Sequence, residues 1–123
     1  MRRPPEIWRY DESAFRETAT PGMKRRVFNG DGMSLAFWRI KEGVGPTPYA
    51  GHPHNEQFGL VIAGQLDFRL GSSTRTVLGP GDIYWAPTNA PHGDSRFVGD
   101  PTRNGEVWIL DIFHPVREEY RNG

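Results

Sequence analysis

Two histidines stand two residues apart in the segment Gly51-His52-Pro53-His54-Asn55-Glu56-Gln57. In a strand, residues i and i+2 point to the same face, so the two imidazoles could converge on one point. Imidazole nitrogens together with an oxygen donor suit zinc, nickel, iron or manganese. A third nitrogen could come from His92, in the loop after the apolar segment Ile83–Ala86. The spacing indicates a site for one divalent metal ion, whereas a His-x-His pair alone is more often part of a surface loop.

A carboxylate interrupts the apolar run Val107-Trp108-Ile109-Leu110-Asp111-Ile112-Phe113. Two-residue alternation places Asp111 on the same face as Ile109 and Phe113. An isolated buried charge is very unfavourable, so this side chain must be paired, bound to a ligand or in contact with water in a pocket. Asp111 is therefore a candidate proton carrier, and the alternative is a structural ion pair with a neighbouring arginine.

The elements that position these residues are predicted to be short strands. The chain has 123 residues, about one domain, and contains 15 glycines and 11 prolines. Asn29-Gly30-Asp31-Gly32 is a strong hairpin turn, and Gln65–Leu70 alternates polar and apolar residues. We expect an all-β fold with at most one short helix, at Asp11–Thr18. The predicted strands are 25–28, 33–41, 58–63, 65–70, 74–78, 83–86 and 106–113.

Composition argues against several classes of protein. Fifteen basic and fifteen acidic residues balance, so no charge excess favours binding to nucleic acid. No apolar run approaches the 18 residues of a transmembrane helix, and the basic start Met1–Pro5 is not followed by the apolar region of a secretory signal. The chain has no cysteine, so any metal ligands must be nitrogen and oxygen. We expect a cytoplasmic protein that does not bind to membranes.

Two motifs resemble those of the cupin superfamily. The first cupin motif ends with Glu, six residues and Gly, which Gln57 and Gly64 match with Gln in place of Glu. The second motif runs Gly, five residues, Pro-x-Gly, two residues, His; here Gly81, Pro87-Thr88-Asn89 and His92 reproduce that spacing. Asn replaces Gly at position 89, and both residues tolerate a left-handed backbone. The resemblance implies a small single-domain cupin, a double-stranded β-helix or jelly-roll barrel, with metal ligands His52, His54, Gln57 and His92.

The first motif departs from the family pattern in one respect. Only two residues separate His54 from Gln57, where the family has three or four. In an unbroken strand His52, His54 and Glu56 would share a face and Gln57 would point away. Either the backbone bulges before Gln57, which the distance to Gly64 favours, or Glu56 is the oxygen ligand.

The C-terminal segment resembles a narrower group, the KdgF-like cupins. Their last strand ends Asp-x-Phe-x-Pro-x-Arg, and here the segment reads Asp111-Ile112-Phe113-His114-Pro115-Val116-Arg117. Members convert unsaturated uronates to a linear keto form. The resemblance implies that Asp111 and Arg117 are catalytic and that Phe113 lines the substrate pocket. A guanidinium suits a uronate because it binds a carboxylate through two hydrogen bonds.

The metal-binding pattern predicts metal-dependent chemistry on a small oxygenated acid, and the resemblance implies that this chemistry is ring opening and tautomerisation of a uronate. The alternatives are a metal-dependent cupin dioxygenase and a sensor that binds a small ligand without turnover. Residues 1–28 are predicted to form an N-terminal arm outside the cupin domain, residues 29–123. Because that arm carries apolar side chains, we expect it to pack on the barrel or on the partner in a homodimer.

Other aromatic and basic residues are given structural roles. Trp38, Trp85 and Trp108 are predicted to lie in the core, although any of them could stack on a sugar. Lys24-Arg25-Arg26 is expected to be the solvated start of a strand.

Overall fold

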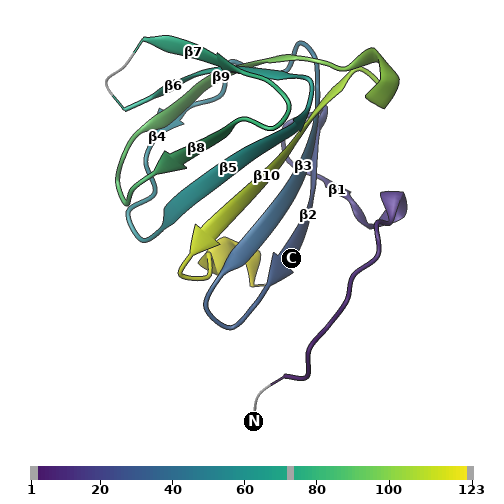
Figure 1. Cartoon of the computed structure of the whole chain (residues 1–123), viewed down its shortest axis with the longest axis vertical. Helices are drawn as coiled ribbons and strands as arrows, with labels where there is room; N and C mark the ends of the chain where they lie inside the picture. The colour runs from purple at the N-terminus through teal and green to yellow at the C-terminus, as the bar shows by residue number, and fades with distance from the viewer. Residues whose placement is uncertain (1–2, 72–73, 122–123) are drawn as a thin grey trace.

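The protein folds into two antiparallel sheets that face each other (Figure 1). The computed structural model describes residues 3–71 and 74–121. Within them, a six-stranded sheet has the order β1-β2-β3-β10-β5-β8 and a four-stranded sheet has the order β4-β9-β6-β7. In chain order the elements are η1 (Glu12–Ala14), β1 (Arg16–Glu17), β2 (Met23–Asn29), β3 (Ser34–Lys41), β4 (Tyr49–Ala50), β5 (Glu56–Ala63), β6 (Gln65–Leu70), β7 (Arg75–Leu78), β8 (Ile83–Ala86), β9 (His92–Val98), η2 (Pro101–Arg103), β10 (Glu106–His114) and η3 (Glu118–Tyr120).

The core forms where apolar residues alternate along strands of both sheets. Val61 of β5 and Ile109 of β10 pack with Leu66 and Phe68 of β6 and with Phe97 of β9. Removing these side chains from water supplies about 25 cal/mol per Å² of apolar surface. The core fills one end of the space between the sheets and leaves the other end, next to the polar residues of β5 and β10, for a site.

Turn residues set how the strands connect. The hairpin predicted at Asn29–Gly32 is confirmed, since Asn29 pairs with Ser34 and the Gly30 amide donates to the Met33 carbonyl at 2.8 Å. Gly64 carries the chain from one sheet to the other with a φ of +72°, and a Cβ there would meet the Val98 carbonyl oxygen. Only glycine fits both conditions easily.

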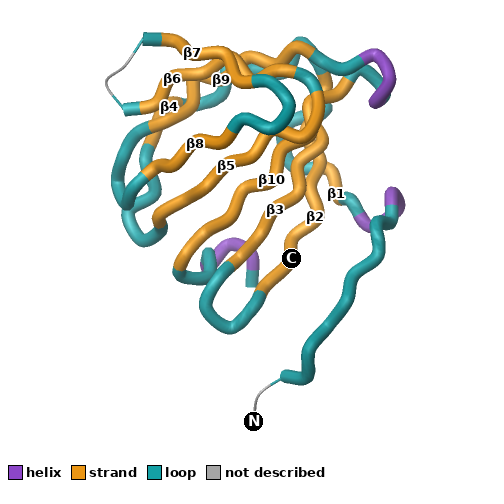
Figure 2. Tube along the Cα trace, in the orientation of Figure 1, coloured by secondary structure: helices purple, strands orange, loops and turns teal. Residues whose placement is uncertain are grey.

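The N-terminal segment differs from the prediction. In place of a helix over Asp11–Thr18, a single 3₁₀ turn at Glu12–Ala14 is capped by Asp11, and Arg16–Glu17 then pairs with β2. Strand pairing satisfies the backbone groups that a helix would have used. Residues 3–11 run as an extended arm beside the edge of the large sheet formed by β1 and β2 (Figure 2), and Trp8 packs edge-on against Phe28 of β2.

The boundary between the arm and the domain at residue 28, and the homodimer, stay predictions. No helix in the described residues is long and apolar enough to cross a membrane.

Candidate functional site

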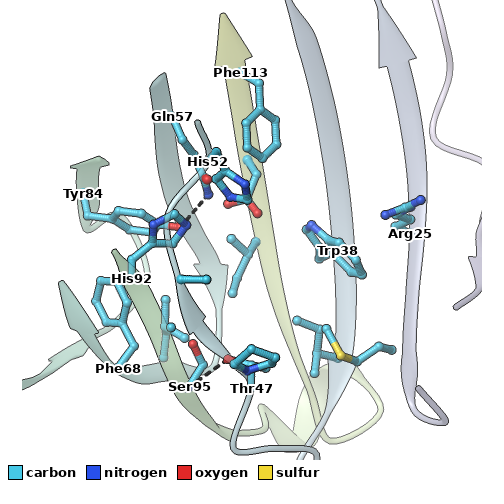
Figure 3. A pocket seen from close by; sticks show the side chains of 18 of the residues that line it. Arg25, Trp38, Thr47, His52, Gln57, Phe68, Tyr84, His92, Ser95 and Phe113 are labelled. Carbon is cyan, nitrogen blue, oxygen red and sulfur yellow. Dashed lines mark hydrogen bonds between the residues drawn. The ribbon is translucent and has the colours of Figure 1, made fainter. Parts of the chain in front are cut away.

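A cavity of about 320 Å³ lies between the two sheets. Its polar side chains come from both sheets and from the loops beside them (Figure 3). The polar and aromatic side chains that carry the argument below are Arg25, Trp38, His52, Gln57, Tyr84, His92, Asp111, Phe113, Arg117 and Tyr120. Most of the predicted site residues therefore meet in one place.

His52 and His92 lie together at one side of the cavity. Their ring centroids are 4.9 Å apart, and His92 Nδ1 lies 3.1 Å from the Ala90 carbonyl oxygen. Burial, followed by the nearby Arg117 charge, lowers the pKa of His52 to about 4. Burial also lowers the pKa of His92. Both rings are therefore neutral at pH 7, which is the form that binds a metal ion or accepts a hydrogen bond.

Gln57 projects from β5 into the cavity and is 2% exposed. Its amide nitrogen donates to the Tyr84 hydroxyl at 2.8 Å, which leaves Oε1 buried with no hydrogen-bond partner among the described residues. Tyr84 reaches this position by lying across Gly59, where a Cβ would overlap its ring. The Tyr84 ring, which lies across Gly59, thus fixes the orientation of the Gln57 amide.

Asp111 faces the cavity from β10, on the face predicted from alternation, together with Ile109 and Phe113. Burial raises the pKa of the Asp111 carboxyl to about 7, although Gln57 and Tyr84 favour its charged form. Within residues 3–71 and 74–121, its Oδ1 atom has no hydrogen-bond partner, and no arginine forms an ion pair with it. This placement favours a functional carboxyl over the structural ion pair.

Arg117 follows β10 and lies beside Phe113 and His52. Its guanidinium carbon is 5.0 Å from the Phe113 ring centroid, and Nη1 lies 2.8 Å from His52 Nδ1. Nη2 forms an ion pair with the exposed Glu119. The Nε atom is buried without a hydrogen-bond partner in the part of the chain that the structure describes. Arg117 therefore retains one buried N–H donor that no described residue satisfies.

His54 and Glu56 lie elsewhere. The strand β5 begins at Glu56, so the histidines stand in a turn and the strand alternation assumed for His52 and His54 does not apply. His54 is exposed and does not line the cavity, while the Trp85 indole donates to Glu56 at 3.0 Å on the outer side of the sheet. Of the two proposed oxygen ligands, only Gln57 faces the cavity.

The cavity is also lined by Arg25 and Trp38, which were expected to have structural roles, and by Tyr84, which the sequence did not single out. Arg25 was expected to be solvated, but the alternation of β2 turns it into the cavity; Trp38 lines the cavity as well. Trp85, expected in the core, is 49% exposed. Tyr84 had one available signal, the small residue Gly59 on the adjacent strand, which pairs with it in register.

The sequence-family model for the cupin domain matches residues 36–100, more than half of the chain. The chain belongs to the cupin family. KdgF from a Halomonas species shares the fold with a TM-score of 0.80 at 22% identity, over 93% of this cupin and 98% of that chain. An RmlC-like cupin from Shewanella frigidimarina gives a TM-score of 0.75 at 20% identity, over 94% and 96% of the two chains.

A curated relative matches a shorter region. Over 43 residues this cupin is 44% identical to the H2HPP isomerase of Bacillus subtilis. The match covers 34% of this chain and 18% of the length of that protein. The expected cupin fold is thus confirmed.

Cupins commonly bind a divalent metal ion. The described residues contain no cluster of three or more His, Cys, Asp and Glu side chains suited to a metal. The available set is instead two neutral imidazoles and the unpartnered Gln57 oxygen, a neutral nitrogen and oxygen set that fits a first-row divalent ion. For His52 to bind through Nε2, its proton must move to Nδ1, and the hydrogen bond from Arg117 would be lost.

Proposed function

We propose that this cupin is a metal-dependent isomerase that moves a proton on a small, oxygen-rich carboxylate. An unsaturated uronate, undergoing ring opening and tautomerisation, is the first substrate to consider. The observation that carries the proposal is that three residues lining one cavity each have a buried polar atom without a partner in the described chain: Gln57 Oε1, Asp111 Oδ1 and Arg117 Nε. Buried polar groups in proteins are nearly always hydrogen-bonded, so three such residues around one cavity favour a bound ligand.

Arg117 supplies the binding contact for the substrate. Its buried Nε can donate to a carboxylate, and a second hydrogen bond from the same guanidinium would fix the orientation of that group. Phe113 is buried, and the cation–π contact between its ring and the Arg117 guanidinium helps to hold that guanidinium in place. The substrate carboxylate would thereby be held at the side of the cavity next to Asp111.

Asp111 supplies the proton transfer. A carboxyl group whose pKa is raised to about 7 can both donate and accept a proton near neutral pH. In a tautomerisation, its carboxylate takes the proton of an enol hydroxyl and its acid form then donates a proton to the neighbouring carbon. The carbonyl forms as the carbon–carbon double bond shifts, so the reaction needs no oxidant or reductant.

His52, Gln57 and His92 would hold the metal ion. A bound divalent ion supplies Lewis acidity, which polarises a substrate carbonyl or hydroxyl. Because the three ligands are neutral, they would leave the ion its full charge. The low pKa of His52 keeps its ring available as a ligand down to mildly acidic pH.

The central experiment measures the loss of unsaturated uronate absorbance with the wild type and with Asp111→Asn. General acid–base assistance is worth on the order of 10²–10⁴ in rate, so turnover should fall by that factor while metal content stays constant. Asp100→Asn is the matched control, because Asp100 caps an exposed turn away from the cavity. Full activity in Asp111→Asn would overturn the assigned role, and oxygen uptake in a parallel electrode measurement would favour the dioxygenase.

The metal site is tested by metal analysis of three histidine variants. His52→Ala and His92→Ala should lose the bound ion and retain a folded β protein by circular dichroism. His54→Ala should keep it, because His54 lies outside the cavity. Loss of metal in His54→Ala would show that the turn closes to bring all three histidines together, as the motif spacing suggested.

A further inference from the structure

Arg25 is a second cation in the cavity, and the proposed mechanism does not use it. It lies on β2, four strands from β8 within the large sheet and remote in sequence from the metal-binding motifs. The alternation of β2 turns Met23 and Arg25 toward the cavity, whereas Arg26 donates to the Arg9 carbonyl of the N-terminal arm. An arginine that points into a cavity is expected to have an anionic partner there.

Aromatic rings hold the Arg25 side chain in place. Its guanidinium carbon lies 5.3 Å from the ring centroid of Trp38 and 4.8 Å from that of Tyr120. Arg117 approaches the same Tyr120 ring, at 5.4 Å. Figure 3 shows Arg25 on the far side of Trp38 from His52. The cavity thus has one guanidinium next to the histidines and another beyond Trp38, with Tyr120 in contact with both.

The charges in the cavity are not balanced. Asp111 is the one acidic residue that lines it among the described residues, against two arginines. Arg117 has Glu119 as an ion-pair partner, but no carboxylate in residues 3–71 and 74–121 lies within ion-pair distance of Arg25. Two like charges around one aromatic ring repel each other, and an anion between or beside them would relieve that repulsion.

We propose that Arg25 and Arg117 bind two anionic groups of the same ligand, so that the cavity selects small diacids over monoacids. The inference rests on the proposed function only in taking this cavity as the substrate site. The substrate class becomes a sugar acid or keto acid that carries a second carboxylate or a phosphate. A simple uronate would use Arg117 alone, and a uronate with a second acidic group would use both arginines.

The experiment compares acids of equal chain length by NMR titration of the whole protein. The probes are succinate, glutarate and adipate, each paired with its monoacid, butanoate, pentanoate or hexanoate. In the wild type, the diacid whose length fits should bind at least about tenfold more tightly than its monoacid. Arg25→Gln should reduce that ratio to near one and leave the monoacid Kd unchanged, since the monoacid uses Arg117.

Lys24→Gln is the matched control, because it removes the same charge from the adjacent position of β2, on the other face of the strand. It should leave the wild-type ratio unchanged. The proposal is overturned if no diacid binds more tightly than its monoacid, or if Arg25→Gln keeps the preference and only lowers Tm, which would make Arg25 a structural stacking residue. The NMR titration measures binding and not turnover. Failure of uronate turnover would therefore count against the proposed function but would not change the measured preference for diacids.

Discussion

Replacing Asp111 by Asn should stabilise the fold while it removes activity. Asn keeps the size of the side chain and carries no charge at any pH. In the wild type the carboxyl is enclosed by protein, its Oδ1 is without a partner among the described residues, and its pKa is raised to about 7. The fold therefore favours the protonated acid and disfavours the carboxylate that prevails at higher pH.

The sign and size of this difference in stability follow from the pKa values of the Asp111 carboxyl in the unfolded and folded chain. The unfolded chain releases this proton near the ordinary value of 3.8 and the folded chain near 7. A raised folded pKa means that the stability contributed by the group is complete below about pH 4, is lost as the pH rises to 7, and stays lost above it. One pKa unit is worth about 1.4 kcal/mol, so the loss is at most about 4 kcal/mol at pH 8. The residue as a whole is only half-buried, so the measured loss should be smaller.

The assay is urea denaturation of wild type and Asp111→Asn at pH 4 and pH 8, with EDTA present so that no bound ion contributes. The difference in free energy of unfolding should be close to zero at pH 4 and should favour Asn by about 2–4 kcal/mol at pH 8. The other ionisable groups are the same in both proteins, so their contributions to the free energy of unfolding cancel in the difference. A variant that is less stable than the wild type at pH 8 would refute the reasoning, because that is the behaviour of a carboxylate held in a structural ion pair.

Two further substitutions test how the fold supports the site. Gly59→Ala should destabilise the protein by about 1–3 kcal/mol, since its Cβ would overlap the Tyr84 ring, and the loss should shrink in the double variant with Tyr84→Ala, measured by a double-mutant cycle. Glu106→Gln should cost about 3 kcal/mol in urea denaturation, because Glu106 is the buried partner of Arg39, which is 1% exposed. Glu12→Gln, at the exposed partner of the same arginine, should cost less than about 1 kcal/mol. Equal losses in the two variants would contradict the greater importance of the buried pair.

Alternation and turn chemistry made much of the fold predictable. The Asn29–Gly32 hairpin is local, and Asn89 adopts a φ of 69°, the left-handed backbone expected where the motif has glycine. The inward face of β10 was also predictable, because Asp111 and Phe113 stand two residues apart in a regular strand. Each of these features depends on residues that are close in sequence.

The arrangement of the histidines was harder to predict because it depends on where a strand begins. A turn at Pro53 and His54 precedes β5, and a hydrogen bond from the Asn89 amide to the His52 carbonyl, at 3.0 Å, fixes the backbone there. The buried Asn55 side chain donates to the Pro115 carbonyl at 2.5 Å. Both contacts join segments that are distant in sequence, so local periodicity could not show that His52 would face the cavity and His54 would not.

The polar residues of the cavity reduce stability, and that reduction is itself an argument for binding. Arg25, Gln57 and Asp111 stand at inward strand positions where an apolar side chain would extend the core. Leaving a buried donor or acceptor without a partner costs about 1–3 kcal/mol, and a domain has only about 5–15 kcal/mol of net stability. A purely structural barrel would gain by filling these positions with Val, Leu or Ile. Their chemistry is accounted for if a ligand that is itself charged and rich in oxygen provides the missing partners.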